Sequence, residues 1–215
     1  IPVTVIGHRK GNNLEENLKC NFGMPGPEGY RKALRMMKQA EKFDRPIITF
    51  IDTPGAYPGI EAEQFGQSQA IAKNLAKMSA LTVPVIAIVT GEGSSGGALA
   101  IGVANRVFML ENAVYSILSP EGFASILWGD SAKKEQASEV MRLTADDLYG
   151  YGVIDGIIEE PAGGVHRNPQ AVFTEIDSLL YKEIKHLKNK SGNELAKSRY
   201  EKFRKMDEQF LRGAD

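Results

Sequence analysis

The chain has 215 residues, of which 42% are apolar and 25% charged, and its 26 Lys and Arg residues nearly balance 27 Asp and Glu residues. These values are typical of globular proteins, and they exclude disordered and fibrous classes. The longest apolar stretches, 83–89 and 98–104, are much shorter than the roughly 18 consecutive apolar residues of a membrane-spanning helix. We therefore expect a soluble protein that does not contact a membrane.

The chain has a single cysteine, Cys20, and three histidines that are scattered along the sequence. One thiol cannot form an internal disulfide, and this spacing is not that of a zinc site. The composition favours a reducing compartment, so we expect a cytoplasmic protein with no metal bound to this chain.

Strand-like and helix-like segments alternate through the first 130 residues. The runs 46–52 and 83–90 are continuously apolar, which is typical of strands covered on both faces, and a shorter strand is expected at 3–6. Between the strands, apolar residues recur at helical spacing in 30–40 and 63–81. This alternation predicts an α/β fold.

The alternation is interrupted after residue 105. Short strands are expected at 106–110 and 114–118, and the short connection between them indicates either a tight antiparallel pair or a bent pair. The chain then becomes mostly helical, with Ser119 and Thr144 as expected N-cap residues. A last short strand is expected at 153–158.

The charge is concentrated at the C-terminal end. Residues 182–215 contain ten Lys and Arg against six Asp and Glu, a net charge of about +4. We therefore divide the chain into a core, residues 1–181, and a basic tail, residues 182–215, which packs on the core or on a partner, while nucleic acid is the least favoured partner. The tail is expected to form an amphipathic helix with its apolar face at Leu195, the stem of Arg199, Phe203, Met206 and Phe210.

Two glycine-rich turns, 52–59 and 91–98, follow the two central strands. Ligands of α/β proteins usually bind beyond the carboxyl ends of the strands. Gly96 and Gly97 are expected at the start of a helix, where N–H groups are unpaired and an oxygen can approach a backbone that has no side chains. The turns therefore predict an oxyanion hole, unless these glycines serve only close packing of the helix on the sheet.

The turns also match two other motifs. Asp52-Thr-Pro-Gly55 is similar to a GTPase switch, but no phosphate-binding loop with the pattern G-x-x-x-x-G-K-[ST] precedes it. The run 93–97 matches the G-x-S-x-G elbow of serine hydrolases. That alternative predicts a hydrolase or protease with Ser95 as nucleophile, and its base and acid would come from His166 or His186 and from Asp146, Asp147 or Asp155.

Long motifs match one family over nearly the whole chain. They lie at 7–11, 21–25, 27–33, 50–59, 91–102, 119–122, 124–128 and 200–204. On these residues the sequence closely resembles the alpha subunit of the bacterial acetyl-CoA carboxylase carboxyltransferase. Motifs this long are far more specific than the five-residue hydrolase pattern. The chain departs from the family at Ser94, where glycine is usual, and this makes the loop slightly less flexible.

The resemblance implies a crotonase-type (ClpP/crotonase-like) fold, a spiral of β-β-α units with a helical C-terminal region. It also implies transfer of the carboxyl group from carboxybiotin, held on the biotin carboxyl carrier protein, to acetyl-CoA, which gives malonyl-CoA for fatty acid biosynthesis. Family members act with a beta subunit that carries zinc, in an α2β2 assembly, and with a biotin carboxylase. This chain would therefore supply half of a shared site.

The resemblance also implies roles for residues of both turns. The backbone of Gly96 and Gly97, with Gly55 and Ala56 opposite, is expected to form the oxyanion hole on the biotin side. A side-chain base is not required, because the ureido anion of biotin can itself take a proton from the acetyl group. Glu92 and Glu121 are the less favoured candidates for such a base, since glutamates at a helix start are more often caps. Further substrate contacts, with a CoA thioester or with the carrier protein, are expected from Glu92, Gly93, Ser95, Tyr57, Arg9 and Lys10.

Overall fold

The computed structural model describes residues 1–206. Its helices and strands follow the order in which the sequence patterns alternate. In chain order they are β1 (Thr4–Gly7), α1 (Leu14–Lys19), η1 (Asn21–Gly23), α2 (Pro27–Lys42), β2 (Ile47–Thr53), α3 (Ile60–Gln64), α4 (Gln67–Ala80), β3 (Val85–Ser94), α5 (Ser95–Leu99), β4 (Arg106–Leu110), β5 (Val114–Ser116), α6 (Pro120–Trp128), η2 (Ser131–Lys133), α7 (Lys134–Met141), α8 (Ala145–Gly150), β6 (Gly156–Ile158), η3 (Val165–Arg167), α9 (Pro169–Leu187) and α10 (Gly192–Arg204).

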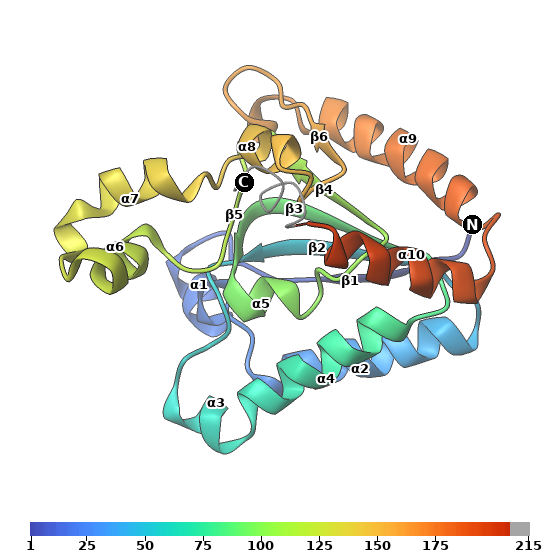
Figure 1. The fold of residues 1–215 in the computed structure, drawn as a ribbon, viewed down its shortest axis with the longest axis horizontal. Coiled ribbons are helices and arrows are strands. Elements are labelled where there is room, and N and C mark those ends of the chain that lie inside the picture. Colours follow the sequence, from blue (N-terminus) through green and yellow to red (C-terminus); the bar gives the residue numbers. More distant parts are fainter. Residues whose placement is uncertain (207–215) are drawn as a thin grey trace, which may run out of the picture.

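The six strands form one sheet in which every strand pairing is parallel. Five strands lie side by side in the order β1-β2-β3-β4-β6, and β5 pairs with the end of β3. Because β1 to β4 lie side by side in chain order, the connecting helices carry the chain forward across this part of the sheet (Figure 1). Parallel strands need such crossover connections.

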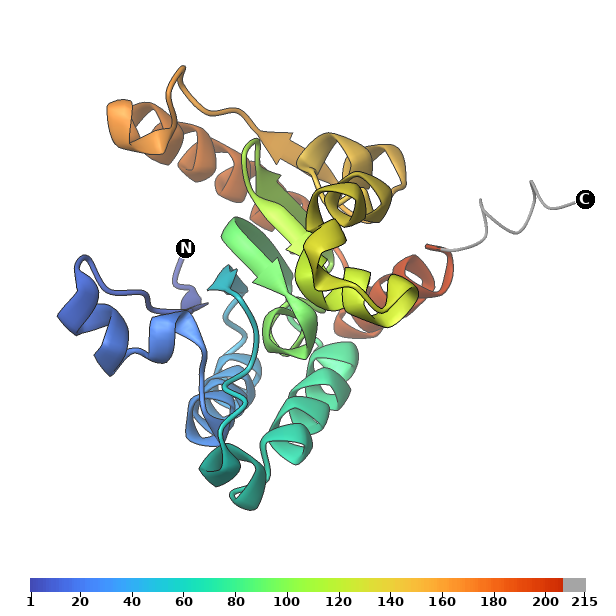
Figure 2. The ribbon, with the colours of Figure 1, turned by 90° about the vertical axis from the view of Figure 1, so that its left-hand side faces the viewer.

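Helices cover both faces of the sheet, which explains the continuously apolar central strands. The paired helices α2 and α4 lie on one face, and α9 lies on the other (Figures 1 and 2). The core combines β2 and β3 with Met37 of α2, Met78 of α4 and Ile184 of α9, all of them buried. The predicted helix at 30–40 is confirmed as the inner part of α2.

Two sequence-based expectations differ from the structure. The helix expected over 63–81 is divided into α3 and α4 by Gly66, whose φ of +79° is a left-handed conformation that favours glycine. Of the two arrangements expected for 106–110 and 114–118, an antiparallel or a bent pair, the antiparallel pair is wrong. Instead, β4 pairs with the first half of β3 and β5 with its second half, so the chain bends and follows the same long strand.

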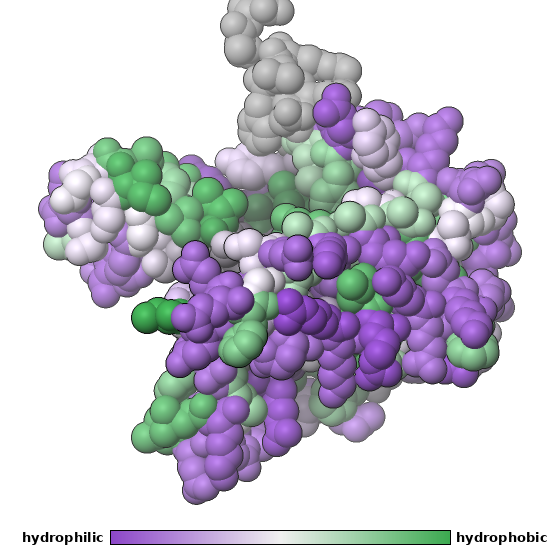
Figure 3. Space-filling view, turned by 90° about the horizontal axis from the view of Figure 1, so that it is seen from below, coloured by the Kyte–Doolittle hydropathy of each residue, from purple (hydrophilic) through white to green (hydrophobic). Residues whose placement is uncertain are grey.

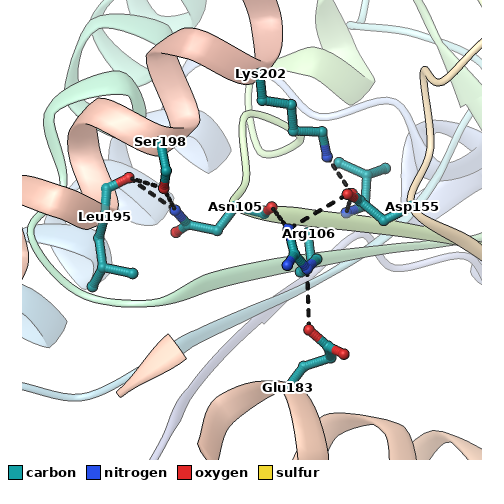
Figure 4. A network of polar contacts seen from close by, with 8 residues as sticks. Asn105, Arg106, Asp155, Glu183, Leu195, Ser198 and Lys202 are labelled. Atoms are coloured by element: carbon teal, nitrogen blue, oxygen red, sulfur yellow. Dashed lines mark hydrogen bonds and ion pairs between the residues drawn. The ribbon is translucent and has the colours of Figure 1, made fainter. Parts of the chain in front are cut away.

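The C-terminal helices are tied to the sheet by charged side chains at the start of β4. Asp155 accepts a hydrogen bond from the Val107 N–H at 2.7 Å and forms an ion pair with Lys202 of α10 (Figure 4). Arg106 Nε lies 3.1 Å from a carboxylate oxygen of Glu183 of α9. These contacts lie at the amino end of the sheet, away from the turns that follow β2 and β3.

The tail packs through α10, whose Leu195 is buried in the main core. The expectation for Arg199 is wrong in one respect: its guanidinium as well as its stem is buried, because five polar groups surround it. The expected boundary after residue 181 lies within α9, and the division into core and tail stays a prediction. Phe210 lies outside the described residues. Among residues 1–206, no helix combines the length and apolar character needed to cross a membrane.

Candidate functional site

The two glycine-rich turns meet at the carboxyl ends of β2 and β3. Gly96 and Gly97 lie in the first turn of α5, and the Ser94 side chain does not cap this helix. The backbone N–H groups of Ala56, Gly96 and Gly97 donate no hydrogen bond to another element within residues 1–206. Unpaired N–H groups are the donors from which an oxyanion hole is built.

Close approach of the turns depends on Gly97. A Cβ atom at this position would lie 2.5 Å from the Ala56 nitrogen and 2.5 Å from the Gly55 carbonyl carbon, so only glycine fits. At Gly96 the nearest atom would be a methyl of Ile71 at 3.7 Å, an ordinary contact. Gly97 therefore serves close packing, the alternative explanation given above for both glycines. At Gly96 the backbone is open on the side where a side chain would lie.

The first glycine-rich turn, 52–59, is held by Thr53, which is buried. Its hydroxyl donates to the Gly55 carbonyl at 2.7 Å and accepts from the Gly55 N–H at 3.1 Å. Gly55 has a φ of +149°, a conformation that side chains rarely adopt. Because the Gly55 N–H is already bonded, Ala56 provides the free donor of this turn. The helix α5 has only five residues, so its unpaired N–H groups and not a long-helix dipole are the donors.

A charged group lies beside the turns and consists of Lys10, Asp52 and Glu92. The Lys10 ammonium lies 2.7 Å from a carboxylate oxygen of Asp52 and 2.6 Å from one of Glu92. The Asp52 carboxylate also accepts from the Glu92 N–H at 3.0 Å. We expected Lys10 and Glu92 to contact substrate, whereas Asp52 was not among the expected contacts. Its place at the start of the first glycine-rich turn, 52–59, was the available signal.

His8 lies beside this group and is held in its neutral form. Its Nδ1 accepts from the Asp52 N–H at 3.3 Å, and its Nε2 is buried without a hydrogen-bond partner. Burial lowers the pKa of His8 to about 4, although the Asp52 carboxylate and the Gly97 backbone act in the opposite direction. His8 is therefore neutral at pH 7.

The other predicted contact residues are spread around the turns. Arg9 is exposed and lines a separate cavity of about 420 Å³. Tyr57 folds its ring over Gly59, where a Cβ would lie 2.4 Å from the ring, and it donates its backbone N–H to Pro25. Gly93 is buried against the Tyr115 ring. The structure therefore brings Lys10 and Glu92 together, but it places Arg9 apart from them.

An apolar cavity of about 580 Å³ opens next to Gly96. It extends between α5, β5, α6 and α10, and its apolar lining greatly exceeds its polar lining. Burial raises the pKa of Tyr115 in its wall to about 12, so this phenol stays neutral. The lining includes Ser95, Gly96, Leu99, Tyr115, Phe123 and Phe203.

The hydrolase interpretation requires a base next to Ser95. This residue is exposed and has a φ of +55°, but its hydroxyl forms no hydrogen bond within residues 1–206, with either His166 or His186 or any other group. Of the candidate acids, Asp155 pairs with Lys202 and Asp147 accepts from Thr144. A catalytic triad is therefore not assembled in the described part of the chain.

Comparisons with known proteins show which family the chain belongs to. The family model described as acetyl co-enzyme A carboxylase carboxyltransferase-like matches residues 1–207. The chain belongs to this family. It is 61% identical over 206 residues to the acetyl-coenzyme A carboxylase carboxyl transferase subunit alpha of Clostridium acetobutylicum, and 60% identical to that of Geobacillus kaustophilus. Each match covers 96% of this chain, but 75% of the first relative and 63% of the second.

Solved structures of the same fold confirm the crotonase-type architecture. Transcarboxylase 12S, a hexamer with a multienzyme core, is 25% identical with a TM-score of 0.58, and the match covers 64% of this chain and 29% of that one. A Pseudomonas malonate decarboxylase hetero-dimer is 18% identical with a TM-score of 0.72, and covers 92% of this chain and 78% of that one. Within residues 1–206 no group of three or more His, Cys, Asp or Glu is arranged to hold a metal.

Proposed function

We propose that this member of the carboxyltransferase family supplies the biotin side of a shared active site. The reaction is the transfer of a carboxyl group from carboxybiotin to acetyl-CoA, which yields malonyl-CoA for fatty acid biosynthesis. One observation carries the proposal: in a chain of this family, two turns with unpaired N–H donors touch each other, and one of the donor residues, Gly96, lines an apolar cavity.

The cavity suits the chemistry of biotin. Ligand pockets usually combine apolar walls with a few placed polar groups, and a cavity of about 580 Å³ lined by Gly96 and Ser95 has this character. Biotin supplies the carboxyl group and an oxygen that becomes negative when the group leaves. The N–H groups of Ala56, Gly96 and Gly97 stabilise that charge without any side-chain nucleophile. Ser95 lines the same cavity, and its hydroxyl contacts the bound ring.

The second half of the site comes from a partner. The names of the relatives denote an alpha subunit, and we assign the CoA-binding half and the zinc to a beta subunit, in an α2β2 assembly. The arm formed by α6 and α7 gathers apolar side chains on the molecular surface (Figure 3). An exposed patch of this kind is typical of contacts between proteins. The carrier protein, charged by a biotin carboxylase, would bring biotin to the site in the cytoplasm.

The experiment measures carboxyl transfer in the reverse direction. The purified chain is mixed with its beta subunit, and malonyl-CoA decarboxylation is followed in the presence of free biotin. Activity is expected only when both chains are present, because each supplies one half of the site. Ser95→Ala is expected to retain most of it, because the donors are backbone groups that this substitution keeps.

Two outcomes would overturn the proposal. One is activity of the beta subunit alone at the level of the mixture. The other is an inactive mixture in which this chain, by itself, reacts with a serine-directed fluorophosphonate and the reaction is lost in Ser95→Ala. The latter would establish a hydrolase.

A further inference from the structure

Lys10, Asp52 and Glu92 form a charged group, which we call the Lys10 cluster, beside the two glycine-rich turns, which we call the donor turns. The cluster joins three segments that are distant in the sequence. Lys10 follows β1, Asp52 lies near the end of β2 at the start of the first turn, and Glu92 lies near the end of β3 at the start of the second. One ammonium group bonds both carboxylates, at 2.7 Å and 2.6 Å, across 82 residues of sequence in the case of Glu92. The Glu92 N–H also donates to Asp52, so side chain and backbone fix the same two turns.

Two glycines let the backbone pack closely against this cluster. A Cβ at Gly91 would lie 2.5 Å from an Asp52 carboxylate oxygen, and one at Gly23 would lie 2.8 Å from Cγ of Lys10. The side chains are therefore packed against bare backbone on two sides. A small displacement of Asp52 or Glu92 must move the turn that carries it.

The charges of the cluster depend on one another. Burial acts to lower the pKa of Lys10, but its bonds to Asp52 and Glu92 outweigh burial, so the pKa of Lys10 is raised and it stays charged. Without the ammonium group, two carboxylates would face each other across the junction of the turns. Their repulsion would separate Ala56 from Gly97, whose backbones are in close contact.

We propose that Lys10 is a positioning residue that sets the distance between the donor N–H groups of the two turns through Asp52 and Glu92. The inference rests on the proposed carboxyltransferase function and concerns the same site. It differs from the sequence-based expectation that Lys10 contacts a CoA thioester or the carrier protein, because the ammonium is already bonded to two carboxylates. The side chains of Lys10 and Asp52 are 30% and 32% exposed, so the ion pair contributes little to overall stability and a variant should fold.

The test compares Lys10→Met with wild type in the mixture with the beta subunit. Displaced donors reduce transition-state stabilisation, so kcat is expected to fall about tenfold to a hundredfold. The KM values for malonyl-CoA and biotin should change by less than about twofold, because in this proposal the cluster acts through the turns and not by binding a substrate. Lys19→Met, which removes a lysine from an exposed pair with Glu15, is the matched control and should behave as wild type.

A double variant separates repulsion from the simple loss of a lysine. Adding Glu92→Gln to Lys10→Met removes one of the facing carboxylates, and it should recover part of the lost kcat although it removes a second charged group. If Lys10→Met folds poorly, the same double variant decides: a lowered kcat at unchanged KM supports the inference, and a wild-type kcat overturns it.

Other results would overturn the inference in distinct ways. A rise in the KM for malonyl-CoA with an unchanged kcat would make Lys10 a substrate contact. Wild-type values for both parameters in Lys10→Met would remove any role. An inactive wild-type mixture would instead contradict the proposed function itself, so the two failures are distinguishable.

Discussion

Adjacent glycines can have different duties, and the donor turn shows this at the scale of single residues. At Gly97 an added Cβ would collide with the backbone of the facing turn, while at Gly96 it would meet only Ile71 at ordinary distance. In the proposed site both residues offer their N–H groups. Only Gly97 also permits the two turns to touch.

This difference predicts unequal effects of the same substitution. Gly97→Ala should push the turn at Gly55 and Ala56 away and lower kcat by about a hundredfold, the usual effect of losing one oxyanion donor. Gly96→Ala keeps its N–H and the local packing, so its loss should be below about tenfold. Steady-state kinetics of the mixture with the beta subunit checks both, with urea unfolding as the control for folding. Equal losses would mean that the contact at Gly97 has no special role.

At the scale of elements, the end of α4 is completed by a side chain from α10. Arg199, only 1% exposed, donates to the carbonyl oxygens of Met78 at 2.8 Å and Leu81 at 2.9 Å, and to the Asn105 side chain. The last carbonyls of a helix have no partners within it, so a buried helix end needs donors from elsewhere. Burial lowers the pKa of Arg199 to about 10, and it remains charged at pH 7.

Removing this guanidinium should destabilise the whole fold. Arg199→Ala leaves several buried carbonyl oxygens without donors, and we expect the free energy of unfolding to fall by about 3–5 kcal/mol. Lys197→Ala in the same helix is the control, because the Lys197 side chain is 77% exposed, and its effect should stay within about 0.5 kcal/mol. Urea-induced unfolding measures both. A loss below 1 kcal/mol for Arg199→Ala, on the usual scale of single substitutions, would show that water replaces the guanidinium.

At the scale of the whole molecule, the two ends of the sheet have separate roles. The carboxyl ends of β2 and β3 carry the donor turns, while the start of β4 carries the ionic contacts that hold α9 and α10 (Figure 4). Lys202 is central to the ionic contacts at the start of β4, because burial lowers its pKa although Asp155 acts to raise it. An ammonium in this position needs its carboxylate partner.

Replacing Asp155, the ion-pair partner of Lys202, is expected to loosen α10. Asp155→Asn should leave Lys202 without a counter-charge and increase transient opening of α10, so that tryptic cleavage between residues 188 and 205 accelerates about tenfold or more. Glu15→Gln, at an exposed pair, is the control. A cleavage rate equal to that of wild type would show that apolar contacts such as Leu195 hold the helix by themselves.

Local chemistry let the sequence determine much of this protein. The continuously apolar runs identified the buried strands, and the two N-caps are confirmed by bonds from the Gly122 and Asp147 N–H groups to Ser119 and Thr144. The long motifs identified the family, which the comparisons confirm. Each of these signals depends on residues that are neighbours in the chain.

Only the tertiary structure decided which distant residues meet. The partners of Lys10, the burial of the Arg199 guanidinium and the pairing of β5 with the second half of β3 all join segments whose local patterns say nothing about each other. A lysine in a loop has the same local pattern whether it faces water or two carboxylates. Its role is determined by packing, because its long-range neighbours come together only when the chain folds.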